Sequence, residues 1–142
     1  MGADPGPAAI DHVGLAVADL EAAVGFYQRL LGTRPALREE VPQDGVTAVF
    51  FDLGPASLEL LGSTRPDSSV ARFLEKRGEG IHHLAYQVAD LEAELERWRG
   101  WGAELLDQHP RRGARGRLVG FIHPRSAGGV LTELCQRGAE PD

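Results

Sequence analysis

The sequence predicts an α+β fold in which two tandem βαβββ modules form one open, cup-shaped sheet. The main observation is a repeat: Val-Ala-Asp-Leu-Glu-Ala occurs at residues 17–22 and again at residues 88–93. A histidine stands five residues before each copy, at His12 and His83, so both features recur at a spacing of 71 residues. Because 71 is half of the 142-residue chain, we interpret the chain as one module written twice.

The first half contains the elements of one module in order. An apolar, partly alternating pattern predicts a strand over residues 9–17. A helix is expected over residues 20–31, with Asp19 as its N-cap and Gly32 as its C-terminal stop. Three strands are then expected, at residues 34–41, 46–53 and 57–62, with turn residues between them.

The second half repeats this order. A strand is expected over residues 81–89, then a helix over residues 91–100 that Asp90 caps and Gly102 ends. Three strands follow, at residues 103–107, 118–123 and 130–136, with an Arg- and Gly-rich loop at 108–117. The expected organisation is one structural domain made of a disordered tail (1–8), a first module (9–62), a connector with a short helix (63–80), a second module (81–136) and a tail (137–142).

Composition excludes several classes of protein. The net charge of −6 argues against nucleic-acid binding, which needs a basic face. Apolar runs fall far short of the ~20 residues that span a bilayer, and the N-terminus lacks a signal-peptide pattern, so no membrane association is expected. The single cysteine, Cys135, excludes an internal disulfide and fits a reducing, cytoplasmic setting.

Each half also ends in an apolar strand that carries one acid, Glu59 in the first and Glu133 in the second. An unpaired carboxylate is costly to bury, so acids in such strands indicate a partner. Two glutamates and the two repeat-related histidines, His12 and His83, are suitable ligands for one divalent metal ion. Side chains alternate along a strand, so only one of His82 and His83 can face this site.

These residues resemble a known family. The module order, Ile-Asp-His-Val-Gly at 10–14, the His-His pair and the endings His-Pro-Arg and Gly-Val-Leu-Thr-Glu-Leu are similar to the vicinal oxygen chelate superfamily and, within it, to its methylmalonyl-CoA epimerase branch. The resemblance covers about residues 9–136. It implies a metal-dependent isomerase that interconverts the (R) and (S) forms of methylmalonyl-CoA by removing and returning the α-proton through a metal-stabilised enolate.

The resemblance also implies roles for particular residues. His12, Glu59, His83 and Glu133 match the family's metal positions, and we expect Co²⁺, with Mn²⁺, Ni²⁺, Mg²⁺ and Zn²⁺ as alternatives. Several relatives place a catalytic glutamate where this chain has Ala48, and a glutamine ligand where it has Glu59. We therefore hypothesise that Glu133 and Glu59 form the acid/base pair, one of them giving up its ligand role during turnover.

The expected partners are a coenzyme A thioester and a second copy of the chain, as a homodimer. Candidate contacts to the anionic coenzyme are basic, although a solvated loop explains most of them equally well: Arg111, Arg112, Arg115, Arg117 and Arg125. His123 is expected to order the turn before the last strand. Two alternatives on the same fold stay open, a glyoxalase I-type lactoylglutathione lyase and a non-catalytic ligand-binding protein like the bleomycin-resistance group. A dioxygenase is less favoured because Glu59 would be a surplus ligand.

Overall fold

The computed structural model describes residues 6–7 and 9–138 and divides the chain into two compact units. The first unit is His12–His82, and the second unit combines Met1–Asp11 with His83–Asp142. The division therefore passes between two consecutive residues of the first strand. Of the tails expected at 1–8 and 137–142, only residues 6–7 and 137–138 belong to the described part.

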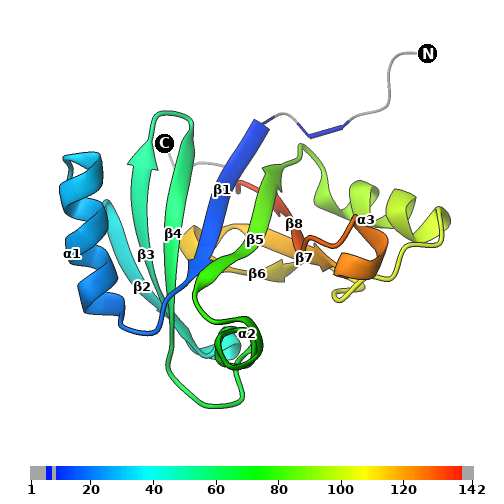
Figure 1. Ribbon diagram of the computed structural model, residues 1–142. Helices are drawn as coiled ribbons and strands as arrows, with labels where there is room; N and C mark the ends of the chain where they lie inside the picture. Colours follow the sequence, from blue (N-terminus) through cyan, green and yellow to red (C-terminus); the bar gives the residue numbers. More distant parts are fainter. Residues whose placement is uncertain (1–5, 8, 139–142) are drawn as a thin grey trace. The chain divides into compact units, whose positions relative to one another are not determined.

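The first unit contains four strands and two helices, shown in blue to green in Figure 1. Its elements are β1 (Ala9–Ala16) from His12 onward, α1 (Leu20–Leu31), β2 (Leu37–Val41), β3 (Val46–Leu53), β4 (Ala56–Ser63) and α2 (Ser69–Arg77). The strand order is β2-β3-β4-β1, in which β3 is antiparallel to β2 and β4 while β1 is parallel to β4. A parallel pair needs a crossover connection, which α1, β2 and β3 supply here.

Helix α1 has the boundaries expected from the sequence. The Asp19 side chain accepts a hydrogen bond from the Ala22 amide at 3.1 Å, and Gly32 ends the helix in the left-handed conformation with φ of 68°. Asp19 is therefore the N-cap and Gly32 the C-cap, as predicted. The helix packs its apolar side chains on a core from β3, β4 and the end of β1; those side chains are Leu20, Ala23, Val24, Tyr27 and Leu31.

The second unit repeats the arrangement. Its elements are β5 (Gly80–Gln87), α3 (Leu91–Gly100), β6 (Arg111–Arg112), β7 (Leu118–Ile122) and β8 (Thr132–Gln136), in the strand order β5-β8-β7-β6. Again the first and last strands are parallel and the others antiparallel. Asp90 caps α3 by accepting from the Ala93 amide, and the buried Leu91 and Leu95 anchor it on the sheet. The predicted α+β class with two βαβββ modules is confirmed.

The predicted strand at 103–107 is wrong. Residues near Leu105 form one isolated bridge with Ile122 and no ladder. The Phe121 amide donates at 2.8 Å to the carboxylate of Asp107 instead of to a backbone carbonyl of a paired strand. The same carboxylate also accepts a hydrogen bond from Arg111 Nε at 2.9 Å. The paired strand is instead β6, two residues inside the segment that we expected to be a loop. No helix in the described ranges is both long and apolar enough to cross a membrane.

Candidate metal centre

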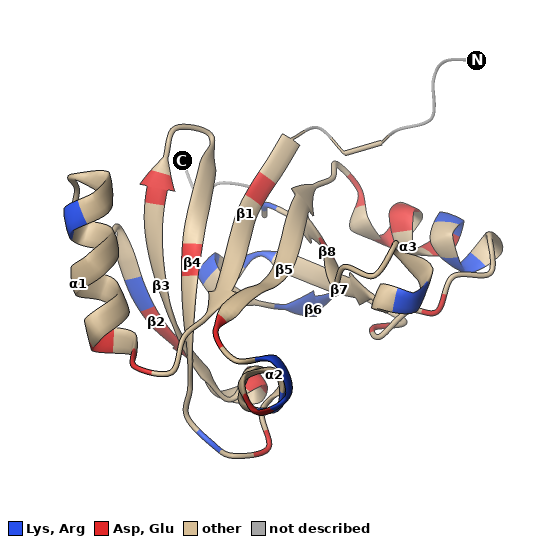
Figure 2. Ribbon diagram, viewed as in Figure 1, with Lys and Arg blue, Asp and Glu red and all other residues tan. Residues whose placement is uncertain are grey.

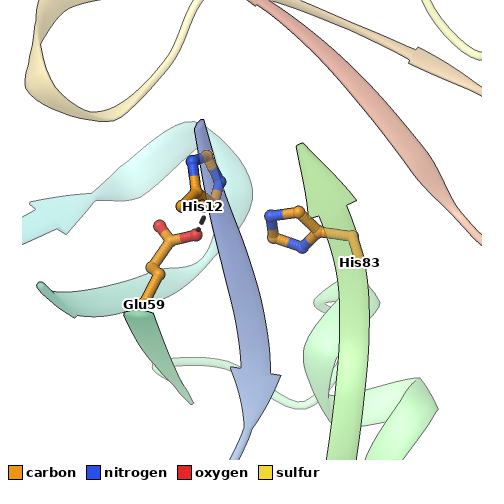
Figure 3. A group of neighbouring side chains, drawn as sticks. All are labelled: His12, Glu59 and His83. Carbon is orange, nitrogen blue, oxygen red and sulfur yellow. Dashed lines mark ion pairs between the residues drawn. The ribbon is translucent and has the colours of Figure 1, made fainter. Parts of the chain in front are cut away.

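The first unit brings one histidine and one glutamate together in its interior. His12 lies on β1 and Glu59 on the parallel neighbour β4, where the register pairs Glu59 with Gly14. Gly14 lies two residues after His12 and therefore on the same face of the sheet. His12 Nε2 lies 3.2 Å from Glu59 Oε1, and Figure 3 shows the carboxylate turned toward the imidazole. Both residues are at most 5% exposed.

The second unit repeats this pair on the corresponding strands. His83 lies on β5 and Glu133 on the parallel β8, where the register pairs Glu133 with Ala85, two residues after His83. His83 Nε2 lies 3.1 Å from Glu133 Oε1, and both residues are again at most 5% exposed. Each histidine thus lies beside the glutamate of its own half. The two halves also have the same strand register, because each glutamate pairs with the residue two positions after its histidine.

A phenylalanine completes each pair, and our sequence interpretation missed it. Phe50 on β3 is the cross-strand partner of Glu59, and its ring meets that of His12 edge to face at 6.0 Å. Phe121 on β7 is the partner of Glu133, and its ring meets that of His83 in the same way at 5.5 Å. Aromatic walls exclude water from the donors and hold the imidazole planes. Phe50 and Phe121 are 71 residues apart, like the two histidines, and this spacing was the signal that could have found them.

The donors in each pair suit a divalent metal ion. Two donors that lie ~2.1 Å from one ion are ~3.0 Å apart at a right angle and ~3.4 Å apart in a tetrahedral arrangement. The observed separations, 3.2 and 3.1 Å, fall in that interval. Imidazole nitrogen and carboxylate oxygen without thiolate favour a first-row divalent ion or Mg²⁺ over the softer metals. The residues present therefore fit such an ion.

The other two histidines of interest have partners away from these pairs. His82 Nε2 lies 3.1 Å from Ser69 Oγ, and its ring meets that of Phe73, so this side chain packs against α2. His123 Nδ1 accepts a hydrogen bond from the Arg125 amide at 3.0 Å and so orders the turn before β8. Both arrangements agree with the expectation that His83, and neither His82 nor His123, faces the site.

The five arginines that we expected near coenzyme A have different surroundings. Arg111 forms an ion pair with Asp107, and its guanidinium lies 5.6 Å from the centre of the Phe121 ring. Arg112 donates to the Gly116 carbonyl at 3.2 Å, and both arginines make the blue strand β6 in Figure 2. Arg115 adopts a positive φ of 61°, the only such non-glycine residue in the described part.

Two of the five are engaged elsewhere. Arg117 is mostly buried and forms an ion pair with Asp11, so the structure gives it an interior partner that the sequence did not suggest. Arg125 is 73% exposed and lies 3.6 Å from Glu104, an arrangement that braces the turn. Ala48 is fully buried on β3 between Glu39 on β2 and Leu61 on β4.

Comparison with known proteins identifies the family. The model of the Glyoxalase/Bleomycin resistance protein/Dioxygenase superfamily matches residues 11–121. The chain belongs to this superfamily, which confirms the vicinal oxygen chelate resemblance.

Within the superfamily, the chain is similar to methylmalonyl-CoA epimerases. It is 40% identical over 129 residues to an ethylmalonyl-CoA/methylmalonyl-CoA epimerase of Cereibacter sphaeroides, over 89% of this chain and 96% of that protein. A crystal structure of methylmalonyl-CoA epimerase from Mycobacterium tuberculosis superposes with a TM-score of 0.92 at 37% identity, over 98% of this chain and 94% of that one. A single-substitution variant of the Streptomyces coelicolor methylmalonyl-CoA epimerase, in complex with 2-nitronate-propionyl-CoA, gives a TM-score of 0.91 at 38% identity, over 94% of this chain and 97% of that one.

Proposed function

We propose that this chain is an isomerase that interconverts the (R) and (S) forms of methylmalonyl-CoA. The observation that carries the proposal is the duplicated buried His–Glu pair, in a chain 37–40% identical to proteins named methylmalonyl-CoA epimerase. The reaction needs one group that removes the proton between the thioester and the carboxylate and another that returns a proton on the opposite face. A site built from two equivalent halves has a suitable symmetry for that task.

His12, Glu59, His83 and Glu133 would together hold one divalent cation, and Co²⁺ is our proposed ion. All four are buried, and each offers an imidazole nitrogen or a carboxylate oxygen as a metal donor. When bound, such an ion acts as a Lewis acid that stabilises the negative charge developing on the thioester oxygen.

Glu133 and Glu59 are the proposed acid/base pair. Each lies on the last strand of its module opposite a phenylalanine, so the two carboxylates have equivalent surroundings. One carboxylate takes the α-proton from one face of the substrate, and the other, in its acid form, supplies the proton to the opposite face. Ala48 supports this assignment, because the resemblance implies a catalytic glutamate at this position in several epimerases, and the methyl side chain of Ala48 has no acid or base group.

The coenzyme A tail is anionic, and the basic segment around β6 is its proposed contact. Arg111, Arg112 and Arg115 lie within five residues of each other and carry three positive charges in a chain of net charge −6. Guanidinium groups suit phosphate recognition because they donate in a planar fork. Arg117 and Arg125 remain candidate contacts. A homodimer and a cytoplasmic location are also part of the proposal.

Proton NMR in D₂O tests the function directly. The protein is freed of metal with a chelator, restored with Co²⁺, and incubated with one epimer of methylmalonyl-CoA. We expect loss of the α-proton signal together with appearance of the other epimer, only in the metal-restored sample. The hemithioacetal of methylglyoxal and glutathione serves as the control substrate. Conversion of the hemithioacetal without exchange in methylmalonyl-CoA would contradict the proposal in favour of a lactoylglutathione lyase.

A further inference from the structure

A second buried polar cluster lies in the second unit, centred on the residue just before a proposed metal ligand. Asp11 is fully buried, and both of its carboxylate oxygens accept hydrogen bonds. Gln87 Nε2 donates to Oδ1 at 3.1 Å, Arg137 donates to Oδ1 through Nε at 3.3 Å and Nη2 at 3.2 Å, and Arg117 Nη1 donates to Oδ2 at 2.5 Å. We call these four residues the Asp11 cluster.

The partners of Asp11 lie at or just beyond the ends of three strands of the second unit. Gln87 ends β5, Arg117 precedes β7 and Arg137 follows β8. The antiparallel register pairs Leu118 with Gln136, so the next residues outward, Arg117 and Arg137, come together at the end of the ladder. A buried carboxylate that receives charge-assisted bonds from two guanidinium groups is held in a narrow range of positions. Asp11 is therefore fixed within the second unit.

The next residue along the chain belongs to the first unit. His12 is bound there by Glu59, and the division between the units falls on the Asp11–His12 peptide bond. Both residues are part of β1, a strand in which neighbouring residues are ~3.3 Å apart and their side chains point to opposite faces. Because Asp11 and His12 are consecutive residues of β1, the contacts that fix Asp11 also restrict the position of the His12 backbone.

We propose that Asp11 is a positioning residue for the metal centre: its cluster holds the backbone of β1 next to His12, the proposed ligand that follows Asp11 in the chain. This inference rests on the proposed function, in which the two His–Glu pairs share one cation. Asp11 would not touch the cation or the substrate. Its loss would leave all four proposed ligands in the chain but would release the backbone that carries His12.

Cobalt binding to the intact protein tests the role of Asp11 without relying on activity. Asp11→Asn keeps the side-chain shape but removes the charge that the two arginines share. The matched control is Glu94→Gln on α3, because Glu94 is also buried in the second unit and pairs with Arg97 at 3.1 Å. We expect Asp11→Asn to weaken Co²⁺ binding by about tenfold in calorimetry, the low end for groups that orient ligands, and to change the visible Co²⁺ spectrum. Glu94→Gln should leave both readouts as in the wild type.

If Asp11→Asn does not fold, Arg137→Gln replaces it, because the Arg137 side chain is 42% exposed and its loss disturbs the interior less. A folded Asp11→Asn or Arg137→Gln protein with wild-type Co²⁺ affinity and spectrum would overturn the inference, and so would an equal change in Glu94→Gln. Failure of the proposed function looks different. In that case the wild-type protein itself binds no Co²⁺ tightly or does not epimerise methylmalonyl-CoA.

Discussion

Replacing Glu59 by glutamine separates the two halves of the proposed proton transfer. Glu59 lies 3.2 Å from His12 and its side chain is 7% exposed, so the isosteric amide fits the same space. The amide oxygen can still act as a metal donor, but the group no longer takes up a proton at neutral pH. A positioned general acid or base contributes about 10²–10⁴-fold to a rate, which corresponds to about 2.7–5.4 kcal/mol at 1.36 kcal/mol per tenfold.

The variant should therefore lose about 10²–10⁴-fold in the rate of epimerisation while one exchange reaction persists. Glu133 remains able to remove the α-proton on its own face and return a solvent proton to that face. In D₂O, one epimer should take up deuterium with its configuration retained, and the other should not. The assay is proton NMR with each epimer separately, at saturating Co²⁺ so that a weaker metal affinity does not lower the rate.

The mirror variant Glu133→Gln is the matched control, because Glu133 occupies the equivalent position in the second unit at 3.1 Å from His83. It should exchange the opposite epimer. Full epimerase activity in Glu59→Gln, or exchange of both epimers in each variant, would refute the assignment of these two carboxylates.

Other predictions concern the metal, the coenzyme and the core. Chelation should abolish epimerisation and lower the melting temperature, since an ion at 100 times its Kd adds about 2.7 kcal/mol of stability; an unchanged melting curve would contradict this. His83→Ala should lose bound metal by elemental analysis, whereas His82→Ala, whose ring packs against α2, should keep it. Charge reversal of Arg112 or Arg115 should raise KM far more than it lowers kcat, and an unchanged KM would place both in a solvated loop. Phe50→Ala should lower the free energy of unfolding by about 3–5 kcal/mol in urea titration, because Phe50 is 1% exposed.

Local chemistry and the repeat made much of the fold predictable. Asp19, Gly32 and Asp90 are capping residues whose preference depends only on the adjacent backbone, and the structure has each of them in its expected place. The strand at 103–107 was misassigned because the conformation of this segment depends on contacts with residues distant in the sequence. Asp107 reaches across to the Phe121 amide, and such a side-chain replacement leaves no periodic pattern in the sequence.

The candidate site shows the same division. The two His–Glu pairs could be predicted because the sequence repeat marks their residues, and each pair lies within one unit. The partner of Arg117 could not be predicted, since Asp11 lies 106 residues away and no local sequence pattern links the two residues. An arginine can pair with an anionic ligand or with a carboxylate of the same protein, and the sequence of an arginine-rich loop is the same in both cases. The boundaries of the modules, the ligand set and the coenzyme contacts stay predictions.

The central claim is that both His–Glu pairs bind a single cation. Calorimetric titration of the metal-free protein with Co²⁺, together with His12→Ala and His83→Ala, measures this most directly. We predict one tightly bound Co²⁺ per chain and loss of tight binding in either variant, because each removes a ligand from the same ion. Two ions per chain in the wild type, or a variant that keeps wild-type affinity, would contradict the account.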